Sequence, residues 1–175
     1  MGYPELARVL RRAGVATEGA QLQDARELFR RMVFNILMDN TDDHEKNHSL
    51  LVVAPFQHGR LRLAPAYDLL PTHSGQGYQE FICGAQGRDS TLDNAMSECD
   101  AFGLTPAEAA SEVLRVLEVV NTWKLHFAQL GVSQRDIENL AQQIDGDNLL
   151  KQRTGFEPGR FVLLPGKRPR KSPFL

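Results

Sequence analysis

The chain has 175 residues, of which 42% are hydrophobic and 24% are charged, and its formal net charge is -2 at pH 7. This composition predicts one soluble globular domain and lacks the basic excess of a dedicated nucleic-acid-binding protein. Two isolated cysteines, Cys83 and Cys99, exclude a disulfide framework and favour a reducing compartment, so a cytoplasmic protein is expected. The sequence shows no secretion signal and no run of 18 apolar residues, so we expect no membrane association.

The first part of the sequence predicts two helices followed by a polar loop. Apolar residues at helical spacing, with a proline near the start and Gly14 after the end, predict a short helix over residues 4–13. A longer helix is predicted over residues 21–38, where apolar positions recur every three or four residues. This pattern stops at residues 39–43, whose Asp, Asn and Thr side chains compete for local backbone hydrogen bonds and favour a turn.

A β-hairpin is predicted next. Residues 48–53 and 60–64 have strand character and flank a segment with turn-forming Pro and Gly residues, which is typical of an antiparallel hairpin. Residues 71–90 are rich in glycine and predict a mobile or ligand-facing loop, with a short strand near residues 78–83.

The rest of the domain is predicted to be helical. Thr91 caps a helix expected to run to residue 101. Residues 105–108 combine an N-cap threonine, an N1 proline and an N3 glutamate, and they open a long, substantially buried helix that ends before Gly131. Ser133 caps a final helix that ends near residue 144.

The predicted elements give an α+β, mainly α-helical fold with a small hairpin between early and late helices. We assign residues 1–150 to this domain and residues 151–175 to a Gly/Pro-rich basic tail. The tail is expected to be solvated, with contact to phosphate or an acidic partner as the alternative, and direct nucleic-acid contact is expected only there. Its basic cluster consists of Lys167, Arg168, Arg170 and Lys171.

The polar loop carries the spacing of a phosphotransferase site. Asp42 lies five residues before Asn47, as in the kinase catalytic loop, whereas Asp43 lies only four before it, so Asp42 is the better candidate for the base. Asn47 and Asp68 offer the oxygen ligands that Mg²⁺ prefers. Lys46 could screen the charge of the transferring phosphoryl group.

Two simpler interpretations compete with this one. Residues 39–43 alone are also typical of an ordinary polar turn, but protein kinases join the catalytic loop to the magnesium aspartate by a hairpin, and one is predicted between Asn47 and Asp68. His44 and His48 are four residues apart, which suits zinc only on a regular helix with further ligands, so a metal-hydrolase site is the less favoured alternative.

Residues 34–48 and 63–70 closely resemble the C-terminal domain of HipA-like serine/threonine kinases, the kinase components of bacterial toxin–antitoxin modules. The resemblance implies a protein-kinase-like C-lobe with Asp42 as the catalytic aspartate and Asn47 and Asp68 as Mg²⁺ ligands. The segments that it implies in ATP binding contain His44, Glu45, Lys46, Asn47, Tyr67 and Asp68. For Tyr67, aromatic packing beside the hairpin is the alternative.

The resemblance also implies an activity and partners. Kinases of this family transfer the ATP γ-phosphoryl group to protein hydroxyls, with aminoacyl-tRNA synthetases among their targets, and a DNA-binding antitoxin restrains them. Their N-lobe carries a glycine-rich loop, a phosphate-binding lysine and an adenine hinge, which nothing before Gln21 can supply. We therefore expect activity when an N-lobe completes the chain, in cis in a longer protein or in trans. The alternative is a non-catalytic binding module, or pseudokinase-like C-lobe, that engages an antitoxin or a substrate protein.

Overall fold

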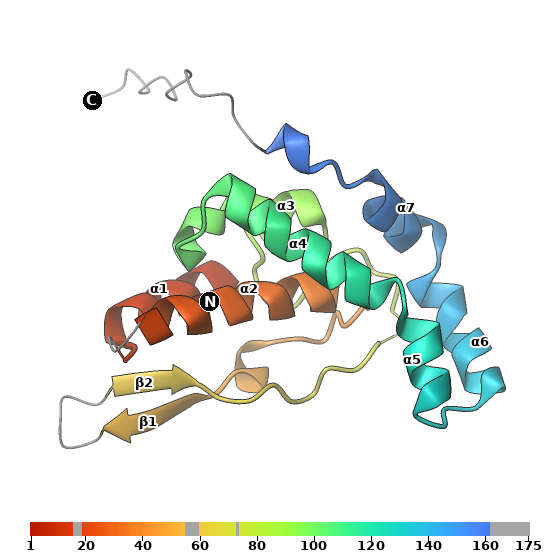
Figure 1. Cartoon of the computed structure of the whole chain (residues 1–175), viewed down its shortest axis with the longest axis horizontal. Helices are drawn as coiled ribbons and strands as arrows, with labels where there is room; N and C mark the ends of the chain where they lie inside the picture. Colours follow the sequence, from red (N-terminus) through yellow and green to blue (C-terminus); the bar gives the residue numbers. More distant parts are fainter. Residues whose placement is uncertain (16–18, 55–59, 73, 162–175) are drawn as a thin grey trace.

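The computed structural model describes residues 1–15, 19–54, 60–72 and 74–161, which form a mainly helical α+β fold (Figure 1). The helices are α1 (Tyr3–Ala13), α2 (Ala20–Leu37), α3 (Leu92–Ser97), α4 (Pro106–Val120), α5 (Trp123–Gln129), α6 (Gln134–Ile144) and α7 (Asp147–Gly155). Short 3-10 helices are η2 (Glu45–Asn47), η3 (Cys99–Phe102) and η4 (Pro158–Arg160), and the strands are β1 (Leu50–Ala54) and β2 (Arg60–Leu63). The predicted fold class is confirmed.

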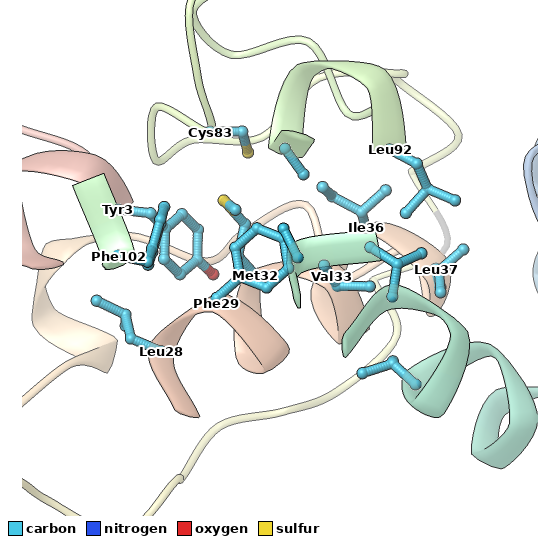
Figure 2. Packing of buried hydrophobic residues seen from close by; sticks show 14 of the residues in the cluster. Tyr3, Leu28, Phe29, Met32, Val33, Ile36, Leu37, Cys83, Leu92 and Phe102 are labelled. Atoms are coloured by element: carbon cyan, nitrogen blue, oxygen red, sulfur yellow. The ribbon is translucent and has the colours of Figure 1, made fainter. Parts of the chain in front are cut away.

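Helix α2 lies at the centre of the fold. It packs against α1 along its side, against the hairpin on one face, and against α3 and α4 on the other (Figure 1). Most of its apolar residues are fully buried because neighbours cover it on several sides, whereas Leu22 near its start is exposed. Figure 2 shows Phe29, Met32 and Ile36 in this core, and the Phe29 ring meets the Phe102 ring edge-to-face at a centroid distance of 5.2 Å.

The hairpin is attached to α2 through one buried carboxylate. Asp24 accepts hydrogen bonds from the Arg62 guanidinium at 2.7 and 3.1 Å and from the backbone N–H of Leu63 at 2.9 Å. The two strands pair antiparallel with Leu50 opposite Leu63. The hairpin expected between Asn47 and Asp68 is therefore present and is fixed to the central helix.

Helix α4 is attached to α2 in a similar way. Glu112 is almost fully buried and pairs with Arg30 at 2.6 Å, Arg26 at 3.6 Å and Arg115 at 3.4 Å. The predicted capping box is also present, since Thr105 and Glu108 each accept a hydrogen bond from the other's backbone N–H.

Two predicted helices are interrupted. The helix that was expected to run to Gly131 stops at Val120 and restarts at Trp123, and α5 is largely exposed rather than buried. The Thr122 hydroxyl donates to the Val119 carbonyl at 2.8 Å and so competes with the helical backbone bonds. The helix expected to run to residue 101 breaks after Ser97, whose hydroxyl bonds the Asn94 carbonyl in the same manner at 2.6 Å.

The short strand expected near residues 78–83 was a wrong prediction. The described part of this segment pairs only in isolated bridges, including Tyr78 with Asp89 and Gly84 with Gly87. Its backbone is pressed against α3, because a Cβ at Gly84 would lie 2.1 Å from the Asn94 carbonyl oxygen. The segment therefore folds around the helix end instead of forming a ladder.

The sequence patterns missed α7, which begins in the segment that follows the last predicted helix and continues past residue 150. Arg153 on α7 is buried and donates to Asp145 at 2.6 Å, so this helix is joined to the end of α6. The basic cluster at residues 167–171 lies outside the described residues. Within the described residues, no helix combines the length and apolarity needed to cross a membrane.

Candidate active site

The candidate site begins where α2 ends, at a strained residue. Asp39 adopts a left-handed conformation with φ of 55°, which is uncommon for a non-glycine residue although Asp adopts it more readily than most. Its carbonyl oxygen accepts bonds from the Thr72 N–H at 2.9 Å and hydroxyl at 2.7 Å, and its carboxylate accepts one from the Gly75 N–H at 3.2 Å. These bonds tie the polar loop to the segment that follows Asp68.

The two adjacent aspartates of the loop have different environments. The Asp43 side chain is buried and accepts hydrogen bonds from the Tyr3 hydroxyl and from His48 Nε2 at 3.0 Å. Because a carboxylate only accepts, His48 carries its proton on Nε2. Asp42 is exposed. The geometry thus gives Asp43 a structural role and leaves the Asp42 carboxylate accessible, while its catalytic role remains a prediction.

Tyr3 connects this loop to α1. Its hydroxyl bonds Asp43 and accepts from the Asn35 side-chain amide at 2.9 Å, and its ring contacts His48 edge-to-face. Burial and the nearby Asp43 charge raise the pKa of Tyr3 well above its ordinary value. Tyr3 is therefore a permanent proton donor to Asp43, and α1 supports the base of the loop.

Asn47 and Asp68 meet across the start of the hairpin. The Asn47 side-chain nitrogen donates to the Asp68 carboxylate, although the two residues are 21 positions apart. Asp68 also has a left-handed backbone, with φ of 57°. The Asn47 side-chain oxygen is buried and has no hydrogen-bond partner. This pair fits a hard cation, because it combines a carboxylate with an unpartnered neutral oxygen.

Tyr67 and His44 hold the chain around this pair. The Tyr67 hydroxyl donates to the Lys46 carbonyl at 2.7 Å and lies 2.8 Å from the Ser49 hydroxyl, while 42% of the residue is exposed. His44 Nδ1 accepts from the Lys46 N–H at 3.2 Å and caps η2. Tyr67 thus binds the loop by its hydroxyl and leaves part of its ring open.

A surface pocket of about 310 Å³ opens beside Asp42. It is lined by Asp42, His44, Glu45, Lys46, Glu80 and Arg88. Glu80 and Arg88 form an ion pair of 3.1 Å on the glycine-rich segment after the hairpin. The loop that was expected to face a ligand therefore supplies one wall of the pocket that contains the candidate base.

A second, more apolar pocket of about 300 Å³ lies between α2 and α4. Phe34, Leu69 and Val116 contribute to its lining, but none of Asp42, Asn47 and Asp68 does. Of these three residues, Asp42 lines the polar pocket at the loop, and neither pocket is lined by Asn47 or Asp68.

The two histidines of the loop do not converge on a common point. His44 caps η2, whereas His48 binds Asp43 and stacks on the Phe81 ring at 5.2 Å. Among the described residues, no group of three or more His, Cys, Asp and Glu side chains is placed to hold a metal ion. The metal-hydrolase alternative thus gains no support from the arrangement of the histidines.

Several residues of the site carry no signal in the sequence. Tyr3 lies 40 positions before Asp43, and Arg88 lies in a segment that predicts only a loop. Asn40 belongs to the polar motif, but turn propensity alone gives it no specific partner. The local spacing of Asp42 and Asn47 could be found without the fold, whereas these tertiary contacts could not.

The loop, the hairpin and Asp68 all lie in the part of the chain that matches a family model. The model described as "HipA-like C-terminal domain" matches residues 1–123. The chain belongs to the HipA-like C-terminal domain family. The resemblance inferred from the sequence is thereby confirmed, and the HipA-like match covers both motifs and the structure up to the start of α5. Comparisons with curated proteins and with solved structures gave no match.

Proposed function

We propose that this HipA-like domain is the C-lobe of a serine/threonine protein kinase, which transfers the ATP γ-phosphoryl group to a protein hydroxyl when an N-lobe completes it. Family membership supports a kinase-related domain. The observation that carries the proposal is the contact of Asn47 with Asp68, together with the exposure of Asp42. These three residues reproduce the order and chemistry of a kinase half-site.

Asp42 is the proposed catalytic base, which orients the substrate hydroxyl and accepts its proton. Its carboxylate is exposed in the pocket of about 310 Å³, where a hydroxyl can approach it. Asp43 is unsuited to this role because it is buried and its Oδ2 atom already accepts hydrogen bonds from Tyr3 and His48. Asp42 and Asp43 therefore have different roles because Asp42 is exposed and Asp43 is buried.

Asn47 and Asp68 are the proposed ligands of Mg²⁺. The Asp68 carboxylate and the unpartnered Asn47 oxygen are the donors available for it. When bound, Mg²⁺ would neutralise charge on the ATP phosphates. His44, Glu45, Lys46 and Tyr67 are proposed to contact ATP from the same loop and from the end of the hairpin, and the Lys46 ammonium would screen phosphoryl charge.

Calorimetric titration of the chain with Mg-ATP tests the nucleotide site. We expect binding that requires Mg²⁺ and that weakens at least tenfold in Asp68→Ala. Asp93→Ala is the matched control, since Asp93 is an exposed carboxylate on α3 whose ion-pair partner among the described residues is Arg160, at 3.3 Å. Binding that ignores Mg²⁺, or that is absent in the wild type, would reject a nucleotide site formed by this chain alone.

Phosphoryl transfer is tested with the N-lobe present, in cis or in trans. Transfer of labelled phosphate to a protein hydroxyl should require Asp42 and should fall by at least two orders of magnitude in Asp42→Asn. Wild-type transfer by Asp42→Asn would remove Asp42 from the mechanism. Complete inactivity of the assembled wild type would favour a binding module that engages an antitoxin or a substrate protein.

The proposed setting is a cytoplasmic toxin–antitoxin module, with a protein substrate and a DNA-binding antitoxin as partners. The family match supports this context without identifying either partner. Inspection of the adjacent reading frames tests it: we expect one that encodes a small DNA-binding protein or the missing lobe.

A further inference from the structure

One buried amide joins the polar loop to the backbone of Asp68. Asn40 is 3% exposed, and its side-chain nitrogen donates to the Asp68 carbonyl oxygen and to the Asn35 side-chain oxygen, each at 3.2 Å. Both hydrogens of the amide are therefore used, one on each side. The hydrogen bond from Asn40 to Asp68 therefore goes to the main chain and not to the carboxylate.

The other end of this link is rigid. Asn35 lies on α2 and is fully buried, and its amide donates to the Tyr3 hydroxyl at 2.9 Å. The Asn40 backbone N–H also bonds the Asn35 carbonyl at 2.9 Å. Asn40 is thus held by the central helix α2. Because Asn40 also bonds the Asp68 carbonyl, it connects Asp68 to the hydrophobic core.

Asp68 depends on a backbone anchor because the hydrogen bond from Asn47 reaches its side chain and not its main chain. The residue is exposed, yet its backbone is left-handed, a conformation that non-glycine residues rarely adopt without support. Asp39 and Asp68 are the two described non-glycine residues with positive φ. Asn40 directly follows Asp39 and bonds the carbonyl of Asp68, so it connects these two left-handed residues.

We propose that Asn40 is a positioning residue that fixes the Asp68 peptide, so that the Asp68 carboxylate faces Asn47. The backbone atoms of a residue fix its Cα–Cβ bond, and its φ and ψ angles restrict its side-chain rotamers, so a bond to the Asp68 carbonyl limits where the carboxylate can point. The consequence for metal binding rests on the proposed kinase function. The fixing of the Asp68 peptide does not depend on it.

Asn40→Asp tests this role at constant side-chain size. The substitution removes both N–H donors and places a carboxylate beside two acceptors. Asn40→Ala is the milder second variant, since it removes the donors without adding charge. Asn94→Asp is the matched control: Asn94 is 1% exposed, and its amide also bonds two acceptors, the carbonyls of Gly87 at 3.1 Å and Asp89 at 2.9 Å.

Two measurements separate positioning from general stability. Hydrogen–deuterium exchange of residues 66–72 reports on the Asp68 segment in the metal-free protein. Electron paramagnetic resonance of free Mn²⁺ reports on the metal site, with Mn²⁺ as the probe for Mg²⁺. We expect both Asn40 variants to exchange at least tenfold faster over residues 66–72 and to bind Mn²⁺ at least tenfold more weakly. Asn94→Asp should leave the exchange over residues 66–72 and the Mn²⁺ affinity unchanged, even if its melting temperature falls as much as that of the Asn40 variants.

The results discriminate between the two proposals. Unchanged exchange over residues 66–72 in both Asn40 variants would overturn the positioning role, as would equal effects in Asn94→Asp. If the wild type binds no Mn²⁺, the proposed metal site fails, while faster exchange confined to the Asn40 variants still supports the anchoring of Asp68. Faster exchange with unchanged Mn²⁺ affinity would overturn the effect on the carboxylate.

Discussion

The Asn47 side-chain amide donates a hydrogen bond to the Asp68 carboxylate, across a hairpin that separates the two residues by 21 positions. The hairpin is fixed to α2 through Asp24, so this contact is set by the core rather than by the loop alone. The bond engages the carboxylate but leaves the Asn47 oxygen without a partner. An unsatisfied buried oxygen has an energetic cost, and a bound cation would remove it.

Divalent cations should therefore stabilise the fold. A ligand that binds the native state at ten times its dissociation constant raises the free energy of unfolding by about 1.4 kcal/mol. We expect Mg²⁺ or Mn²⁺ to raise the melting temperature of the wild type, and a chelator to bring it back to the metal-free value. Thermal denaturation of Asn47→Ala provides the comparison, since this variant should show no metal-dependent shift. An equal shift in both proteins would place the cation elsewhere.

Asp42 and Asp43 should differ sharply in their contribution to stability. Asp43→Ala leaves the buried Tyr3 hydroxyl and His48 Nε2 without their acceptor, so the free energy of unfolding should fall by about 2 kcal/mol or more. Asp42→Ala changes an exposed side chain and should alter it by no more than about 0.5 kcal/mol. Urea denaturation measures both. Similar losses in the two variants would contradict the assignment of Asp43 to structure and Asp42 to the surface.

Local chemistry explains why much of the fold could be predicted from the sequence. The caps at Thr91, Thr105 and Ser133 each accept the expected backbone hydrogen bond, and the helices begin where they predict. The apolar period of α2 and the two runs of the hairpin likewise match the observed elements. For the site, the spacing predicts that Asn47 and Asp68 share Mg²⁺; the structure brings their side chains into hydrogen-bond contact, and the metal role stays a prediction.

The remaining features depend on interactions that a local pattern does not contain. At the break between α4 and α5 the Thr122 hydroxyl competes for the Val119 carbonyl, although the apolar residues continue beyond it. Helix α7 has little amphipathic character and is joined to the fold by a buried arginine, Arg153, bound to Asp145. The supports of the site, Tyr3 and Asn40, act through contacts with residues about 30 to 40 positions away.

Both cysteines should resist thiol reagents in the folded protein. Burial, with the Asp43 charge as a further cause, raises the pKa of Cys83 to about 12, and burial also raises the pKa of Cys99. At pH 8, roughly one Cys83 in ten thousand would be a thiolate, compared with about one in ten at an ordinary pKa of 9.0. Mass spectrometry after brief alkylation should find neither residue modified. Denaturant should expose both, and rapid labelling of the native protein would contradict their burial.

Asp145 should make the link between α6 and α7 sensitive to acid. Burial raises its pKa, but hydrogen bonds from Lys124, Arg153 and Trp123 outweigh burial, so the pKa lies below its ordinary value of 3.8. The charged carboxylate therefore stabilises the fold above the unfolded-state pKa, and this contribution disappears as the pH falls through the lower folded-state value. Asp145→Asn removes it at every pH.

At pH 7 we expect the free energy of unfolding of Asp145→Asn to be about 1 kcal/mol below that of the wild type, a modest value because the carboxylate is partly exposed. The difference should stay constant down to about pH 5 and shrink towards zero below about pH 4. Urea titrations at several pH values measure this difference in the free energy of unfolding. The contributions of other carboxylates cancel in the difference because they titrate in both proteins. Asp93→Asn is the control, since Asp93 and Arg160 form an exposed pair of 3.3 Å. A difference for Asp145→Asn that persists unchanged at pH 3 would show that the side chain acts by packing rather than by its charge.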